Sequence, residues 1–173
     1  NDIWNMVGLP DFRNANTTIY EQDKGEGLYR RTVYNFWKRM APSPNMEIFN
    51  APSRDVCTVK RERTNTPLQA LVTMNDIQFV EASRVLAENV LQSGKGTTPS
   101  EAVREVSQRV LLRPLREEEL KILVSNHRIF LDHYRDYPDE ASKLVNLGET
   151  KADSELPPVE VAALTMVTNQ VFN

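Results

Sequence analysis

The chain has 173 residues, of which 40% are apolar and 26% are charged, and its formal net charge is -3. This apolar fraction and low net charge exclude a disordered chain, and the single cysteine, Cys57, excludes a disulfide scaffold. No apolar run approaches the roughly 20 residues that a transmembrane helix needs, so we expect no membrane span. Composition and pattern alone indicate a mostly helical globular protein and no particular activity.

Positive charge is concentrated in residues 28–63, where eight Lys and Arg stand against three acidic residues, a local net charge of +5. The remainder is acidic, with -3 over residues 1–27 and -5 over residues 64–173. A basic segment in an acidic chain can form an anion-binding face. The alternative is that its arginines pair with acids of the flanking segments inside the fold. The pI of about 5.5 argues against a nucleic-acid partner.

The first elements are expected to be loosely organised. Residues 1–27 are predicted as an extended lead-in anchored by Ile3, Trp4 and Met6. Apolar side chains at helical spacing predict a basic helix over residues 28–40, which two prolines end. An irregular connection should follow to residue 63, with one helical turn at residues 46–49.

The helical bundle is predicted to begin at residue 64 and carries clearer boundary signals. Thr66 followed by Pro67 predicts the start of a short helix. Asn75 is expected to end that helix and to cap the next one, with Gln78 as its capping-box partner. The next helix, over residues 76–91, should bury its apolar face. A polar stripe is expected away from that face, formed by Glu81, Arg84 and Glu88.

Three further helices complete the prediction. Thr98, Pro99 and Glu101 form a helix-start signature, and a long helix is expected over residues 115–134. A polar stretch without a clear pattern should lead from Pro138 to a buried, nearly uniformly apolar helix at residues 157–172. The predicted fold is therefore all-α, an irregular multi-helix bundle of about five to six helices with an extended N-terminal lead-in, forming a single domain over residues 1–173.

Catalytic and metal-binding patterns are weak. His127 and His133 are six residues apart on one predicted helix and so lie on different faces, and no metal site is expected. His127 falls on the apolar stripe and is interpreted as a core residue. Cys57 is interpreted as a small buried hydrophobe; its alternative is a thiolate activated by neighbouring basic residues. The sequence contains no phosphate loop, dinucleotide fingerprint or haem motif, and we expect no cofactor in this chain.

The most distinctive charged cluster, residues 61–67, precedes the helix that begins near Thr66. Arginine side chains near a helix N-terminus can bind carboxylate, sulfate or phosphate. The candidate ligand-binding residues are Arg30, Arg54, Arg61, Arg63 and Asn65. We favour the alternative, in which these side chains join the irregular segment to neighbouring helices through ion pairs, and therefore expect residues 61–65 to be buried.

The same region resembles a known family. The signature runs DVCTVKRERTNTPLQALV at residues 55–72, then ND at 75–76 and QFVEA at 78–82. Supporting matches are GLYRR at 27–31, Tyr34, FWKR at 36–39, Phe49, Ala51, Pro52, Arg54, LRP at 112–114, Glu118, Glu119, DIW at 2–4 and NQVFN at 169–173. The chain resembles a C-terminal domain of unknown function found in large proteins of planctomycetes and related bacteria.

The resemblance implies where the protein is located and that it is part of a larger protein, but it implies no reaction. Family members typically carry an N-terminal signal, often a cytochrome c-like domain, and this module last. It therefore implies an extracytoplasmic C-terminal module of a multidomain protein, with Asn1 as a truncation point. No catalytic residue can be transferred, because the family has no established reaction.

Three functional hypotheses follow. The first is a structural or interaction-mediating module that packs on other domains of its parent protein. The second is binding of an anion, such as an acidic or sulfated polysaccharide, on the basic segment 28–63. The third is a part of an uncharacterised enzyme that uses Cys57 or a carboxylate.

Overall fold

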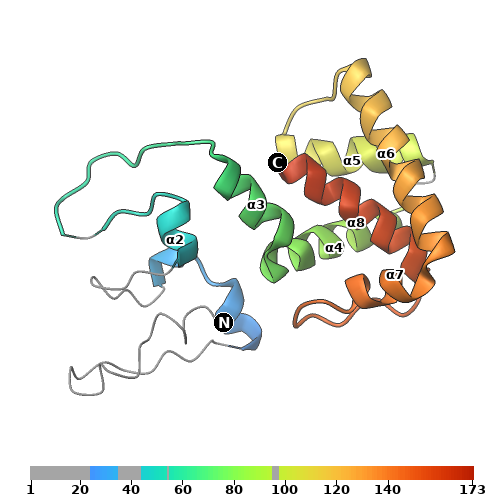
Figure 1. The fold of residues 1–173 in the computed structure, drawn as a ribbon, viewed down its shortest axis with the longest axis horizontal. Helices are drawn as coiled ribbons and strands as arrows, with labels where there is room; N and C mark the ends of the chain where they lie inside the picture. Colours follow the sequence, from blue (N-terminus) through green and yellow to red (C-terminus); the bar gives the residue numbers. More distant parts are fainter. Residues whose placement is uncertain (1–23, 35–43, 54, 95–97) are drawn as a thin grey trace. The chain divides into compact units, whose positions relative to one another are not determined.

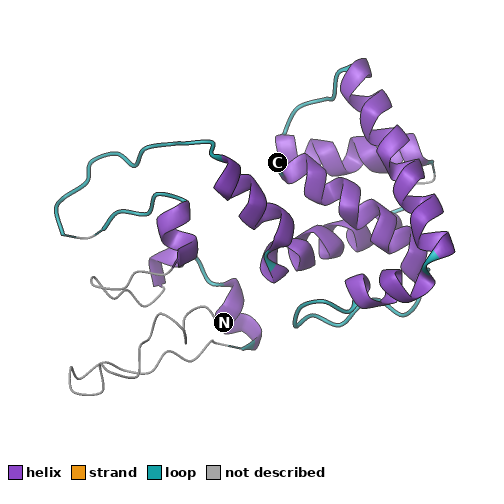
Figure 2. Ribbon diagram, in the orientation of Figure 1, coloured by secondary structure: helices purple, strands orange, loops and turns teal. Residues whose placement is uncertain are grey.

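A computed structural model of the chain describes residues 24–34, 44–53, 55–94 and 98–173 (Figure 1). These residues form seven α-helices and two short 3-10 helices, and no strand occurs among them (Figure 2). The all-α prediction is confirmed, with more helices than the five to six expected. The predicted anchors Ile3, Trp4 and Met6 and the candidate residue Arg54 lie outside the described residues.

The chain divides into two compact units, residues 1–69 and residues 70–173. The predicted start of the helical bundle at residue 64 lies close to this boundary. The expectation of one domain over the whole chain stays a prediction. Each unit is described separately below.

The first unit contains two 3-10 helices, η2 (Gly25–Tyr29) and η3 (Thr32–Tyr34), then α2 (Pro44–Ile48) and the beginning of α3 (Pro67–Asn75). The continuous helix predicted from residue 28 is wrong over residues 28–34, because Arg30 is extended and separates the two short helices. Tyr29, Val33 and Tyr34 are exposed, so no buried face supports a longer helix here. The rest of the predicted helix, residues 35–40, lies outside the described residues.

The second unit is a bundle around its last helix. It contains α4 (Ile77–Gln92), α5 (Pro99–Leu111), α6 (Glu117–Asp136), α7 (Pro138–Val145) and α8 (Pro158–Phe172). α8 packs against all four of these helices, which surround it in Figure 1. Leu164 and Val167 of α8 are fully buried, in two different clusters of the core. The predicted buried terminal helix is confirmed.

Capping boxes form at two of the three predicted helix starts. At α3 the Thr66 side chain accepts a hydrogen bond from the Gln69 amide (3.3 Å), and Gln69 Oε1 accepts one from the Thr66 amide (3.1 Å). At α5, Thr98 and Glu101 form the same reciprocal pair. Asn75 ends α3 as predicted, but it does not cap the next helix: Asp76 caps α4 by accepting a hydrogen bond from the Gln78 amide (2.9 Å).

α7 is the helix that the pattern did not reveal. It begins at Pro138, where a polar, irregular stretch was expected, and it buries only Ala141 and Val145. These two residues pack in a cluster with Tyr134 of α6 and Val161 of α8. An isolated helix of eight residues is marginal in water, so α7 depends on its packing against α6 and α8.

Candidate functional site

Three of the candidate ligand-binding residues, Arg61, Arg63 and Asn65, lie on one irregular loop, residues 49–66, between α2 and α3. Arg30 lies in a separate segment, directly after η2. All four side chains are exposed. None of them lines the cavity described below, so a ligand site made by these residues stays a prediction.

The base of this loop is held closed by Gln69, whose side chain is only 8% exposed. Its Nε2 donates hydrogen bonds to the Ile48 carbonyl (2.8 Å) and to Thr64 Oγ1 (2.9 Å). Asn50 Nδ2 also donates to Thr64 Oγ1, at 2.6 Å. One glutamine therefore joins the end of α2 to the start of α3, and it caps α3 at the same time.

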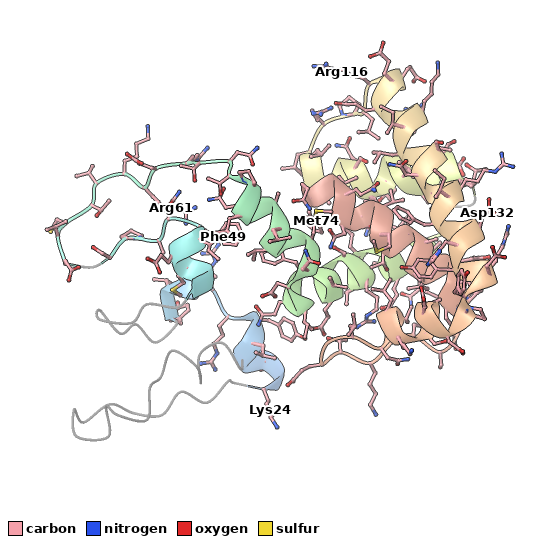
Figure 3. All side chains as sticks on the ribbon, viewed as in Figure 1. Lys24, Phe49, Arg61, Met74, Arg116 and Asp132 are labelled. Carbon is pink, nitrogen blue, oxygen red and sulfur yellow. The ribbon has the colours of Figure 1, made fainter. Side chains whose placement is uncertain are left out.

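Beyond this base the loop is open to solvent, and Arg61 is marked on it in Figure 3. Val56 is 73% exposed and Val59 is fully exposed. Cys57 is exposed as well, so its prediction as a buried hydrophobe is wrong. The expected burial of residues 61–65 is also wrong. Within the described part of the chain, Arg61 and Arg63 form no ion pair.

A second polar cluster lies inside the bundle, where the sequence predicted an outer stripe. Arg84 is fully buried, and Glu81 and Glu88 are nearly so. Arg84 Nη1 pairs with Glu88 Oε1 at 2.6 Å, and Nη2 donates to the Thr150 carbonyl at 2.7 Å. The Thr150 amide in turn donates to Glu81 Oε1 at 2.6 Å.

These contacts attach the connection between α7 and α8 to α4. Glu88 Oε1 accepts a hydrogen bond from the Asp153 amide (3.3 Å), and Gln92 Nε2 donates to the Asp153 side chain. Gly148 approaches Glu81 so closely that a Cβ on it would overlap the Glu81 side chain. Buried charges are tolerated only when they are paired and hydrogen-bonded. The cluster therefore holds the α7–α8 connection against α4. The prediction of an exposed polar stripe is wrong, because residues some 65 positions away in the sequence supply the hydrogen-bond partners of these charges.

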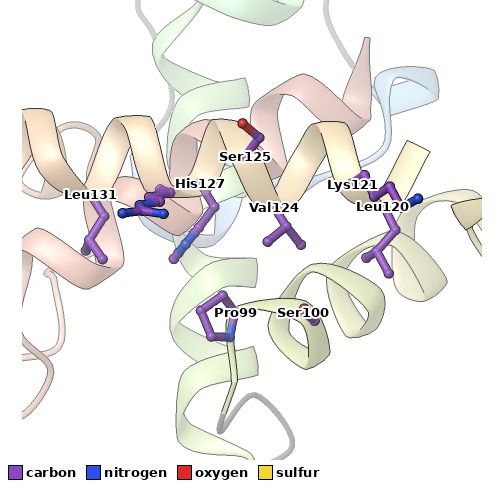
Figure 4. Close-up of a pocket in the computed structure, with 9 residues that line it drawn as sticks. Pro99, Ser100, Leu120, Lys121, Val124, Ser125, His127 and Leu131 are labelled. Carbon is purple, nitrogen blue, oxygen red and sulfur yellow. The ribbon is translucent and has the colours of Figure 1, made fainter. Parts of the chain in front are cut away.

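A groove of about 480 Å³ lies between the first turn of α5 and one side of α6 (Figure 4). Figure 4 shows Val124, His127 and Leu131 pointing from α6 toward the side where Pro99 and Ser100 begin α5. The lining residues are Pro99, Ser100, Leu120, Lys121, Val124, Ser125, His127, Arg128 and Leu131. His127 was the one residue among them that the sequence offered as a possible ligand, and it was interpreted as a core residue.

The two histidines of α6 have different environments. His127 is half-buried, and this burial lowers its pKa, an effect that Glu160 of α8 opposes. His133 is exposed, and its Nε2 lies 3.0 Å from Glu140 Oε2. Among the described residues, no group of three His, Cys, Asp or Glu side chains could hold a metal ion.

Comparison with known proteins identifies one family. Within the described residues, no helix has both the length and the apolar character to cross a membrane. No curated protein and no solved structure matches the sequence. Residues 4–126 match the family PSD1, described as a protein of unknown function (DUF1553). This confirms the predicted relationship to a domain of unknown function, and because the match covers well over half of the sequence, the chain belongs to the PSD1 (DUF1553) family.

Proposed function

We propose that the chain is an interaction module of a multidomain extracytoplasmic protein, and that loop 49–66 docks on another domain of that parent protein. The resemblance of the whole sequence to C-terminal modules of large planctomycete-type proteins, which often carry a cytochrome c-like domain, supports the parent and the location. The loop supports the interaction.

The observation that carries the proposal is the contrast between the base and the outer part of the loop. Gln69, Asn50 and Thr64 hold its two ends together through short hydrogen bonds. Between those ends, two valines and a cysteine are exposed beside Lys60, Arg61 and Arg63, which form no ion pair with a described residue. Long irregular loops in compact domains are commonly functional. A closed base limits the entropy lost when such a loop binds.

The chemistry of the loop favours a protein surface as its partner. Lys60, Arg61 and Arg63 complement acidic groups, and Val56 and Val59 add apolar area that gains from burial. A sulfated or acidic polysaccharide, the second candidate, would use the cations and leave both valines in water. The partner face we infer is therefore an acidic domain surface with an apolar patch.

Hydrogen exchange in the intact parent protein tests this proposal. The amides of residues 55–65 should exchange rapidly in the isolated 173-residue chain and about tenfold more slowly in the parent, because docking withdraws them from water. Val59→Asp should abolish the slowing in the parent. Ile122→Asp is the matched control, since Ile122 is an exposed apolar residue of α6, and this variant should retain the slowing.

Three results would count against the proposal. Equal exchange rates of the loop amides in the isolated chain and in the parent protein would show that the loop does not dock. A sulfated polysaccharide could instead protect the loop amides of the isolated chain from exchange. If that protection is lost in Arg61→Ala/Arg63→Ala and kept in Val59→Asp, the result would favour glycan binding. A hydrolase activity of the chain that disappears in Cys57→Ser would favour the enzyme hypothesis.

A further inference from the structure

The groove between α5 and α6 has two parallel rows of side chains on α6. The inner row is Leu120, Val124, His127 and Leu131, and the outer row is Lys121, Ser125 and Arg128. Spacings of three and four residues place each row along one side of the helix. Pro99 and Ser100 of α5 form the opposite wall (Figure 4).

The inner row gives the groove a firm apolar floor. Leu120 is buried and packs in a core cluster with Val103 of α5 and Val167 of α8, and Val124 packs against the same cluster. The cavity volume of about 480 Å³ lies within the range of about 300–1,000 Å³ that is typical of small-molecule sites. The floor belongs to the core and so does not depend on the loop of the first unit.

The charges at the groove are of one sign. Its nine lining residues include the cations Lys121 and Arg128 and no carboxylate, although residues 64–173 carry a net charge of -5. Lys121 and Arg128 are exposed, and neither forms an ion pair with a described residue. By contrast, both arginines of α5 and Arg113 are paired: Arg104 with Glu117, Arg109 with Glu105, and Arg113 with Glu119.

We propose that this groove binds a small organic anion with an apolar body, such as an aliphatic carboxylate. The apolar body would lie on Val124 and Leu131, and the anionic group would pair with Lys121 or Arg128 at the outer row. These two cations are seven positions apart, which is about 10 Å along the helix axis, so either end of the groove offers a cation.

His127 contributes a polar group to the inner row. Burial lowers its pKa, so the imidazole is neutral near pH 7 and brings no desolvated charge to the apolar floor. Glu160 of α8 acts electrostatically on this ring but is not among the lining residues. A neutral imidazole can donate one hydrogen bond to a bound carboxylate.

Nuclear magnetic resonance titration with octanoate tests the site in the 173-residue chain. Octanoate should shift the His127 ring and Val124 methyl signals, and it should bind more tightly than either acetate or octan-1-ol, which lack the chain and the charge respectively. Lys121→Gln/Arg128→Gln should weaken octanoate binding about tenfold, the loss typical of a charged hydrogen bond.

The matched control is Lys143→Gln on α7, an exposed lysine without an ion pair among the described residues, which should leave octanoate affinity unchanged. Lys121, Arg128 and Lys143 are exposed, so these variants should keep the thermal unfolding midpoint of the unsubstituted chain. Three results would overturn the site: no shift at His127 and Val124, equal affinity for octanoate and octan-1-ol, or equal affinity for octanoate and acetate. Loop 49–66 is not involved, so this outcome is independent of the docking proposal.

Discussion

Single residues control the closest contacts of the structure, and Gly148 is the clearest case. Its φ is +95°, a conformation that non-glycine residues rarely adopt, and a Cβ there would lie 2.8 Å from Glu81 Cγ and closer still to the carboxyl group. Gly148→Ala should therefore lower the free energy of unfolding by about 2–3 kcal/mol, through backbone strain and displacement of Glu81 from the Thr150 amide.

Urea denaturation measures this loss, and Gly94→Ala is its control. Gly94 also has a positive φ of +65°, but nothing lies within 4 Å of a Cβ there. Strain alone should cost about 1 kcal/mol at that site. Equal losses of unfolding free energy in the two variants would show that the close approach of Gly148 to Glu81 does not affect stability.

A second residue, Glu119, makes stability depend on pH. Its carboxylate accepts two hydrogen bonds from Arg113 and one from the Arg116 amide, each 2.9 Å. These contacts lower the pKa of Glu119 from 4.5 to about 2. Because the pKa is lower in the folded state, the stabilisation is complete above pH 4.5 and is lost as the pH falls toward about 2.

Thermal unfolding across this pH range tests the prediction. Glu119→Gln should have a lower unfolding temperature than the unsubstituted chain at pH 7, and this difference should shrink as the pH falls below 4.5. Glu118→Gln serves as control, since Glu118 is exposed in the same helical turn and forms no ion pair with a described residue. A difference that is constant with pH would contradict the assignment.

At the scale of elements, helix starts depend on local side chains. The Thr98 hydroxyl caps α5 by accepting a hydrogen bond from the Glu101 amide (3.3 Å). In turn, the Glu101 carboxylate accepts a hydrogen bond from the Thr98 amide (3.0 Å). Thr98→Ala should cost about 1 kcal/mol of unfolding free energy, because the Glu101 amide loses its partner. Ser154→Ala, at an exposed loop hydroxyl, should cost much less. Similar losses in the two variants, measured by urea denaturation, would argue against the cap.

At the scale of the molecule, the second unit depends on α8. Leu164 is fully buried there, in a cluster with Ala87 and Val90 of α4 and Val106 of α5. Leu164→Ala should lower the free energy of unfolding by about 2–5 kcal/mol, since a cavity opens where three helices meet. Phe172→Ala, at the partly exposed end of the same helix, should cost clearly less in the same urea measurement. A comparable loss at both positions would contradict the central role of α8.

The candidate site was predictable only in part. Sequence reasoning found the segment containing Arg61 and Arg63 but expected it to be buried, because ion pairs with neighbouring acids are the usual fate of arginines inside a domain. It missed the α5–α6 groove, whose side chains lie on two helices, and only His127 stood out as unusual. Rows at three- and four-residue spacing on α6 were visible, but nothing in the sequence says which row faces a cavity.

The amino-acid sequence by itself determined the helical class, the starts of α3 and α5, and the apolar character of α8. Each of these depends on residues within one or two helical turns of one another. Only the tertiary structure decided that Glu81, Arg84 and Glu88 face inward, and that Gly148 must remain a glycine. The reason is physical: a charged helix face can be buried only where distant backbone groups, here those of Thr150 and Asp153, replace the hydrogen bonds of water.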